Sequence, residues 1–330
     1  MRPFEYVRVA DLSSVTAAMA TTPQAKFLAG GTNLVDLMKE DVERPTRIVD
    51  ITQLPLKQIQ RTRSGLSVGA LATNTETANH PLIRENYPLL SQAIVAGASG
   101  QLRNMATNGG NLLQRTRCNY FYDVAMPCNK REPGSGCAAR EGLNRIHAIL
   151  GWTESCVATY PGDMANALYA LNANVRVRAA DGSERLIPVT DFHRLPGDTP
   201  QRDNMLEHGD LILAIELPVS AGEFARHSHY LKVRDRSSYA FAMVSVAAAL
   251  DLNGETIRQA RIVLGSVAHK PWRSAEAEAI LTGRAASEET FQKAAQAALR
   301  DARPLAHNAY KVELAQRSIV RALMRAARLA

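Results

Sequence analysis

Short apolar runs alternate with amphipathic stretches along the first two thirds of the chain. Runs of this length are typical of buried strands, whereas apolar positions at three- and four-residue spacing predict helices. Strands are expected at 4–7 (an edge strand), 26–28, 47–51, 66–70, 175–178 and 211–217. Helices are expected at 15–20 behind a cap at Ser13 or Ser14, at 34–38, from Thr73, at 88–96, and from Asp163 through Leu171.

The last third has a different pattern. Runs at 229–233, 241–252 and 259–265 predict an antiparallel sheet, and helical periodicity returns from Ser287 onward. Residues 218–226 interrupt the pattern and predict a domain boundary, while the proline- and charge-rich stretch 191–203 predicts a surface loop. A chain of 330 residues is long enough for two or three domains.

Two glycine-rich turns stand out between these elements. Gly30 and Gly31 follow a predicted strand and precede a polar residue and a helix, and a second turn runs from Thr107 to Asn111. Glycine lets backbone N–H groups approach a phosphate, and the following helix offers its positive end. Neither turn matches the GxGxxG or P-loop pattern. Two such turns in one domain favour a long anionic ligand such as a dinucleotide pyrophosphate.

Composition narrows the possible functions. The net charge of +7 arises from basic and acidic residues that are interleaved, and aromatic residues are few, which argues against a platform for single-stranded nucleic acid. We expect no signal peptide at the N-terminus and no membrane insertion, because no apolar stretch approaches the roughly 20 residues of a transmembrane helix. Synthesis in the cytoplasm makes structural disulfides improbable and favours metal or redox roles for cysteine.

All four cysteines fall within one segment: Cys118, Cys128, Cys137 and Cys156. Their spacing, C-x9-C-x8-C-x18-C, contains no CxxC pair, which weakens a zinc finger or ribbon. The segment is loop-like and poor in apolar residues, so an internal ligand would explain its folding. Six basic residues lie in or beside it: Arg115, Arg117, Lys130, Arg131, Arg140 and Arg145. An iron–sulfur cluster is the first interpretation, with zinc and reduced structural thiols as alternatives.

Five ordered motifs resemble one family, the FAD-binding medium subunits of molybdenum hydroxylases (the xanthine dehydrogenase group). They cover nearly the whole chain. The motifs are AGGTNL at 29–34, RNMATNGGNL at 103–112, YPGDMA at 160–165, YLKVR at 230–234 and GSVAHKPWR at 265–273. Residues 113–157 are an insertion similar to that of members with an additional [4Fe-4S] cluster, above all the periplasmic aldehyde oxidoreductases and, more distantly, 4-hydroxybenzoyl-CoA reductase.

The resemblance implies an α+β fold with two parts. The first is a two-part FAD-binding domain of the vanillyl-alcohol-oxidase/PCMH type at 1–222, with subdomains at about 1–58 and 59–222. The second is a C-terminal α+β domain at 223–330, an antiparallel sheet with helices.

The resemblance also assigns site residues, and no catalytic residue is among them. The implied FAD contacts are Lys26, Phe27, Leu28, Ala29, Gly30, Gly31, Thr32, Asn33, Leu34, Thr107, Gly110, Asn111, Asp163, Ile212, Leu213 and Lys232. Lys232 is expected near the isoalloxazine ring, where a positive charge stabilises anionic reduced flavin. Gly162 stands where many members have serine. The implied ligands of the [4Fe-4S] cluster are Cys118, Cys128, Cys137 and Cys156.

The implied function is electron transfer by an FAD subunit of a heterotrimeric molybdenum-dependent aldehyde oxidoreductase. Its partners would be a large subunit with the molybdenum cofactor and a small subunit with [2Fe-2S] clusters, with export to the periplasm on a partner's signal and the cytoplasm as the alternative. Other possibilities are a flavin subunit of a xanthine dehydrogenase or hydroxybenzoyl-CoA reductase type, a standalone FAD oxidase, and a zinc-stabilised interaction or nucleic-acid module that uses the basic helix near Arg317.

Overall fold

The structure, a computed structural model, describes residues 1–330 and begins with a small parallel sheet. Its order is β1-β3-β2, with β1 at Glu5–Arg8, β2 at Ala25–Leu28 and β3 at Arg47–Asp50. The chain returns through helices α1 (Leu12–Ala20) and α2 (Leu34–Lys39), which is why the strands run parallel. Val15, Met19 and Val49 form part of its core.

The middle of the molecule is a five-stranded antiparallel sheet covered by short helices. Its order is β4-β5-β8-β6-β7. The strands are β4 (Ile59–Thr62), β5 (Gly65–Gly69), β6 (Asn174–Arg178), β7 (Glu184–Pro188) and β8 (Leu211–Pro218). The helices are α3 (Asn74–Asn79), α4 (Pro81–Asn86), α5 (Pro88–Ala96), α6 (Gly100–Met105), α7 (Asn108–Leu112), α9 (Asp163–Ala170) and α10 (Val189–Phe192).

The C-terminal part is a four-stranded antiparallel sheet with helices on one side. A 3-10 helix, η1 (Val219–Phe224), leads into it. The order is β12-β11-β10-β9, with β9 at Ser228–Val233, β10 at Val244–Asn253, β11 at Thr256–Gly265 and β12 at Trp272–Arg273. Helices α11 (Ala275–Leu281), α12 (Glu288–Ala298) and α13 (Tyr310–Ala326) complete it.

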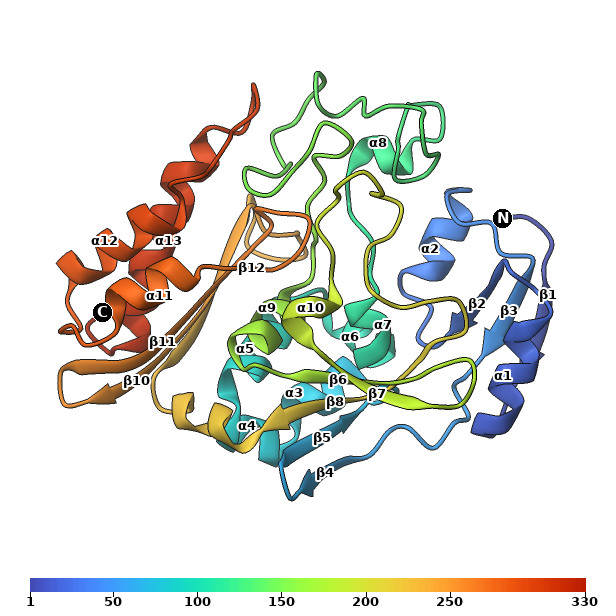
Figure 1. Ribbon diagram of the computed structural model, residues 1–330, viewed down its shortest axis with the longest axis horizontal. Coiled ribbons are helices and arrows are strands. Elements are labelled where there is room, and N and C mark those ends of the chain that lie inside the picture. The colour runs from blue at the N-terminus through green and yellow to red at the C-terminus, as the bar shows by residue number, and fades with distance from the viewer.

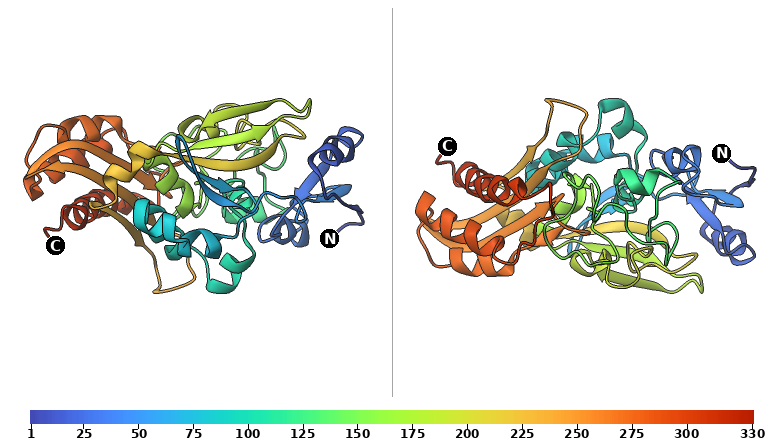
Figure 2. Two further views of the ribbon diagram at one scale, coloured as in Figure 1. Left: turned by 90° about the horizontal axis from the view of Figure 1, so that it is seen from below. Right: turned by 90° about the horizontal axis from the view of Figure 1, so that it is seen from above.

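Helix α9 lies between the middle and C-terminal sheets, and all eight of its residues are buried. Its apolar side chains share one core with Ala247 and Val263 of the C-terminal sheet and with Val175 of the middle sheet. The polar residues of α9 therefore cannot reach water, and each needs a partner inside the protein. Figure 2 shows the three parts in a row, with the N-terminal sheet at one end and the C-terminal helices at the other.

The cysteine segment, residues 113–157, crosses over the other parts. It contains one short helix, α8 (Asn119–Tyr122), and otherwise turns and loops, which lie at the top of Figure 1. Arg117 Nη1 donates to Asp36 of α2 at 2.8 Å, and Asn308 Nδ2, just before α13, donates to the carbonyl oxygen of His147 at 3.2 Å. The segment thus joins the two ends of the molecule.

The structure confirms the predicted α+β class and the antiparallel C-terminal sheet. Two local predictions are wrong. Asp11, rather than Ser13 or Ser14, caps α1, because its carboxylate accepts the Ser14 N–H at 2.9 Å. The stretch 191–203 is not simply a surface loop, since Phe192 and His193 are buried. None of the helices combines the length and apolar content needed to cross a membrane.

Candidate functional site

The first glycine turn joins β2 to α2, and steric constraints explain its two glycines. A Cβ on Gly30 would lie 1.9 Å from the carbonyl oxygen of Met105, and Gly31 has a φ of +72°, which side chains disfavour. None of the backbone N–H groups from Ala29 to Leu34 donates a hydrogen bond within the chain. The turn therefore presents consecutive free donors, the arrangement that holds phosphate oxygens.

Asn33, the residue before α2, makes no side-chain cap hydrogen bond to that helix. Its Oδ1 accepts the backbone N–H of Arg115 at 3.0 Å, while its Nδ2 is buried without a partner. An unpaired buried amide costs free energy unless a ligand accepts from it. Asn33 is thus a further donor at the first turn.

The second glycine turn is the start of helix α7. Thr107 caps this helix, with its Oγ1 accepting the Gly110 N–H at 3.3 Å. Gly109 packs against Ala70, donating its N–H to that residue's carbonyl oxygen at 2.8 Å. Asn111 donates to Asn74 Oδ1 at 2.7 Å, so its amide belongs to the framework of the turn.

The two turns line one cavity of about 480 Å³, which also borders residues 201–212. Twelve of the predicted FAD contacts line it: Lys26, Phe27, Leu28, Ala29, Gly30, Gly31, Thr32, Asn33, Leu34, Thr107, Gly110 and Ile212. Four do not: Asn111, Asp163, Leu213 and Lys232. Sequence reasoning did not single out Glu43 and Asp203, which line it as well. The only feature of these two residues in the sequence is their charge, which does not distinguish them from the many charged residues on the surface.

Asp163 and Lys232 form a separate, buried ion pair. Lys232 Nζ lies 2.7 Å from Asp163 Oδ2, and both side chains are at least nine-tenths buried. Tyr230 donates its hydroxyl to Asp163 Oδ1 at 2.7 Å, and Lys232 also donates to the carbonyl oxygen of Ala96 at 3.2 Å. Burial, with the nearby Asp163 carboxylate, raises the pKa of Tyr230 well above its ordinary value, so the phenol stays protonated. The positive charge of Lys232 is therefore already neutralised within the chain.

Many members of the resembling family have serine at the position of Gly162. A nearby side chain explains why this chain has glycine there. A Cβ there would lie 2.5 Å from the ring and hydroxyl of Tyr160. The Tyr160 hydroxyl donates to the carbonyl oxygens of Asn111 and Leu112 at 3.2 Å each, so the ring holds the end of α7. Glycine at 162 makes room for this contact.

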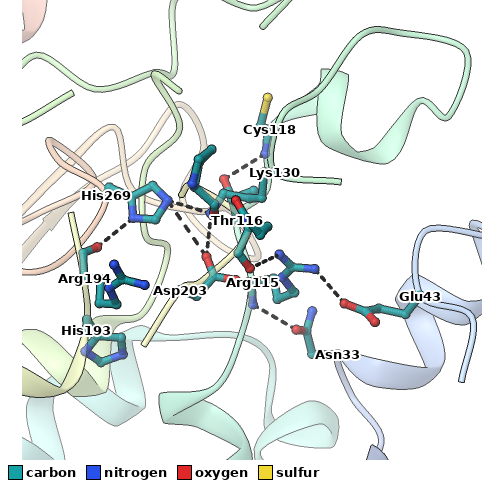
Figure 3. Close-up of polar contacts among 12 residues, drawn as sticks. Asn33, Glu43, Arg115, Thr116, Cys118, Lys130, His193, Arg194, Asp203 and His269 are labelled. Atoms are coloured by element: carbon teal, nitrogen blue, oxygen red, sulfur yellow. Dashed lines mark hydrogen bonds and ion pairs between the residues drawn. The ribbon is translucent and has the colours of Figure 1, made fainter. Parts of the chain in front are cut away.

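A network of charges, with Lys130 buried and the other members partly buried, lies between the cavity and the cysteine segment (Figure 3). Arg115 lies between two carboxylates, with Nη1 2.6 Å from Glu43 Oε1 and Nε 2.7 Å from Asp203 Oδ2. The other Asp203 oxygen is 2.6 Å from Lys130 Nζ. Although burial opposes ionisation, Lys130 and Arg115 hold the pKa of Asp203 well below its usual range. The Asp203 carboxylate is therefore ionised at neutral pH.

The four cysteines gather in one small cluster of buried residues around Phe121. Cys118, Cys128 and Cys156 are buried, Cys137 is half-buried, and none forms a disulfide. No group of three or more side chains has the arrangement of a site for a single metal ion. Burial raises the pKa of Cys118 to about 12 and that of Cys156 to about 11. The neighbouring thiols add to both shifts. The thiols of Cys118 and Cys156 are therefore neutral unless a positive charge joins them.

His147 contacts this cluster directly. Its Nε2 lies 3.1 Å from Cys118 Sγ, and its Nδ1 is buried without a partner. Burial lowers the pKa of His147 to about 4, so the ring is neutral at ordinary pH. Lys311 fixes this stretch from the C-terminal domain, donating to the carbonyl oxygen of His147 at 3.0 Å.

Two family models together match almost the whole chain. The FAD binding domain in molybdopterin dehydrogenase matches residues 2–220, and the CO dehydrogenase flavoprotein C-terminal domain matches residues 229–326. The aldehyde oxidoreductase FAD-binding subunit PaoB of Escherichia coli K12 is 48% identical over 328 residues, 99% of each chain. The glyceraldehyde dehydrogenase medium chain of Sulfolobus acidocaldarius is 27% identical over 85% of this chain and 82% of its own length.

Solved structures agree in fold. A chain of carbon monoxide dehydrogenase from Hydrogenophaga pseudoflava matches with a TM-score of 0.77 at 25% identity, covering 99% of this chain and 98% of that chain. A chain of quinoline 2-oxidoreductase from Pseudomonas putida 86 matches with a TM-score of 0.76 at 24% identity, covering 99% and 98%.

Proposed function

The chain belongs to the family of FAD-binding medium subunits of molybdenum hydroxylases, and we propose that it is the FAD-carrying electron-transfer subunit of a heterotrimeric aldehyde oxidoreductase. The observation that carries this is the 48% identity to an aldehyde oxidoreductase FAD-binding subunit over the full length of both chains. The xanthine dehydrogenase and carbon monoxide dehydrogenase subunits among its relatives, whose names give other substrates, are 24–25% identical. A flavin subunit for such a substrate is the second candidate.

The residues around the cavity fit FAD. The free N–H groups from Ala29 to Leu34 and the unpaired Asn33 amide would donate to the pyrophosphate, and Thr107 and Gly110 would border it from the second turn. Ile212 lies at the same cavity. When bound, FAD accepts electrons singly and releases them in pairs, which suits a junction between one-electron centres and a two-electron acceptor.

The remaining predicted contacts have a supporting role in this proposal. Asn111 holds the second turn through Asn74, and Leu213 belongs to the buried strand beside Ile212. The Asp163–Lys232 pair would meet the flavin nucleotide as a neutral, pre-oriented unit rather than as a free cation. Stabilisation of an anionic reduced flavin by Lys232 would therefore require that the ligand compete with Asp163.

We assign a [4Fe-4S] cluster to Cys118, Cys128, Cys137 and Cys156. Four free thiols in one small cluster, with no cysteine elsewhere, provide the donor set, and they would lose their protons on binding the iron. His147 would donate its Nε2–H to the Cys118 sulfur, a contact that raises the potential of an iron–sulfur centre. A zinc ion and plain reduced thiols are the alternatives. The cluster either takes part in electron transfer or keeps residues 113–157 folded.

The partners in this proposal are a large subunit with the molybdenum cofactor and a small subunit with [2Fe-2S] clusters. The aldehyde is oxidised on the large subunit, so this chain supplies no catalytic residue for that step. We place the complex in the periplasm, exported on the signal of a partner, with the cytoplasm as the alternative. The domain boundary is placed at 222–223, within η1.

A visible spectrum combined with flavin, iron and zinc assays tests the proposal. The purified chain is expected to be yellow-brown, to release FAD on denaturation, and to contain about four iron atoms per chain. A colourless protein with zinc and no flavin would favour an interaction module. Sustained aldehyde oxidation by the isolated chain would favour a standalone oxidase and reject the subunit assignment.

A further inference from the structure

The charge network joins two sites that the sequence keeps apart. It begins at Glu43 beside the cavity, continues through Arg115 and Asp203, and ends at Lys130. Lys130 lies two residues after Cys128, in a turn that the Arg131 N–H closes by donating to the Cys128 carbonyl oxygen at 3.0 Å. Figure 3 shows these contacts running from Asn33 and Glu43 through Arg115 and Asp203 to Lys130 and His269.

The three N–H donors of the Lys130 ammonium group all have hydrogen-bond partners within the chain. The group donates to the carbonyl oxygen of Pro200 at 2.7 Å, to Asp203 Oδ1 at 2.6 Å and to His269 Nε2 at 2.6 Å. His269 Nδ1 donates to the carbonyl oxygen of Arg194 at 2.8 Å, which leaves Nε2 as an acceptor. The Lys130 side chain is 1% exposed. It therefore cannot move without leaving a buried charge unpaired, which is strongly unfavourable.

Asp203 is the residue that both sites share. One carboxylate oxygen holds Lys130 at the cysteine segment, and the other holds Arg115, whose backbone N–H in turn orients Asn33 at the cavity. Two cations, Arg115 and Lys130, alternate with two anions, Glu43 and Asp203, and Lys26 Nζ lies 3.9 Å from Glu43 Oε2 at the cavity end. Loss of any one member leaves an uncompensated charge inside the protein.

We propose that Asp203 is a positioning residue common to the cavity and the cysteine segment, so that FAD binding and the integrity of the cysteine cluster are energetically coupled. The identity of the two ligands rests on the proposed function, but the coupling rests on the ion pairs. Coupling between two sites is reciprocal, so FAD protects the cysteine segment by the same factor by which an intact segment tightens FAD. That factor is expected to be about 5- to 150-fold.

The first test uses the unmodified full chain. Release of iron to a ferrous chelator is followed with saturating FAD and after removal of FAD, at chelator concentrations where the rate follows the population of the opened segment, and release is then expected to be at least about 5-fold slower with FAD. If the purified chain holds no iron, the rate at which a thiol reagent labels the four cysteines replaces this readout. Equal rates with and without FAD overturn the coupling. No variant is involved, so misfolding of a variant cannot imitate the result.

The second test looks for effects that cross from one site to the other. Lys130→Met, which lies outside the cavity, should weaken FAD binding, measured by flavin fluorescence. Glu43→Gln, which lies outside the cysteine segment, should speed iron release or thiol labelling. Unchanged FAD affinity in the first variant together with an unchanged rate in the second also overturns the proposal.

Matched controls separate coupling from general destabilisation. Arg140→Met removes an exposed ion pair with Glu154 inside the cysteine segment and should leave FAD affinity within about twofold. Asp210→Asn removes a buried carboxylate that borders the cavity and pairs with Arg185 at 2.5 Å, and it should leave iron release at saturating FAD unchanged. If the chain contains no iron, only the [4Fe-4S] assignment is rejected. If the chain binds no FAD, both the proposed function and the coupling are rejected. Bound FAD and iron with equal release rates reject only the coupling.

Discussion

Gly30→Ala is the sharpest test of how the two glycine turns form one site. The added Cβ would lie 1.9 Å from the carbonyl oxygen of Met105, 2.7 Å from its carbonyl carbon and 3.2 Å from Ala106 Cα. All three are backbone atoms, so no side-chain rotation relieves the clash. The φ of Gly30 lies outside the left-handed region, and alanine therefore adds no conformational strain of its own. The first turn must move away from the second.

The expected cost follows from that displacement. Overpacking of this kind costs about 1–3 kcal/mol. If the cost falls on the geometry of the cavity, FAD affinity drops by about 5- to 150-fold, since 1.4 kcal/mol corresponds to a factor of ten. FAD binding is measured by fluorescence titration of the FAD-free chain, alongside thermal unfolding.

Gly100→Ala is the matched control. Gly100 begins α6, the helix that ends at Met105, and a Cβ there meets no atom within 4 Å. This variant should bind FAD normally and be unchanged or stabilised by up to about 1 kcal/mol, because alanine restricts the unfolded chain. FAD affinity in Gly30→Ala within twofold of the unmodified chain would refute the argument that contact between the two turns shapes the site.

Three further predictions follow from other parts of the structure. Cys137→Ser should lose the iron of the proposed cluster and bind FAD about 5- to 150-fold more weakly through the coupling, yet still fill with FAD at saturating concentration, because the free N–H donors lie in a separate turn; complete loss of FAD binding together with the iron would contradict this. Lys232→Met should cost about 3–5 kcal/mol in urea unfolding, since Asp163 is left buried and unpaired, and adding Asp163→Asn should recover part of that loss. For Asp50, burial acts to raise the pKa, but hydrogen bonds from Tyr6, Thr52 and Arg8 outweigh it and hold the value at about 2. The unfolded value is about 3.9, so this contribution to stability is present above pH 4 and is lost as the pH falls toward 2; Asp50→Asn should reduce the change in urea midpoint between pH 5 and pH 2.5.

Local patterns were sufficient for several elements because their determinants are close in sequence. The predicted helix at 88–96 matches α5, and the helix expected from Thr73 begins there with a capping box in which Thr73 and Glu76 satisfy each other. Asp11 was missed as a cap because it precedes two serines that look equally suitable. Short helices such as α6 and α7 carry too few residues for a periodic signal.

The candidate site divides in the same way. The free backbone donors of the first turn follow from a strand, two glycines and a helix in succession, and they were predicted from the sequence alone. The sequence did not predict that Asp163 pairs with Lys232, 69 residues later. The resemblance assigns each of these residues to the FAD, and nothing in it relates one residue to the other. Asp203 lay in a stretch expected to be surface, although it pairs with both Arg115 and Lys130.

The sequence by itself thus determined the longer helices and strands, the two glycine turns and the clustering of four cysteines along 39 residues, from Cys118 to Cys156. Only the tertiary structure decided that both turns line one cavity, that Gly30 is required by the backbone at Met105, and that one carboxylate connects the cavity to the cysteine segment. The physical reason is that hydrogen bonds within a turn or helix depend on neighbours in sequence. A buried ion pair depends on how whole elements pack, and residues far apart in the chain then become each other's counter-ions.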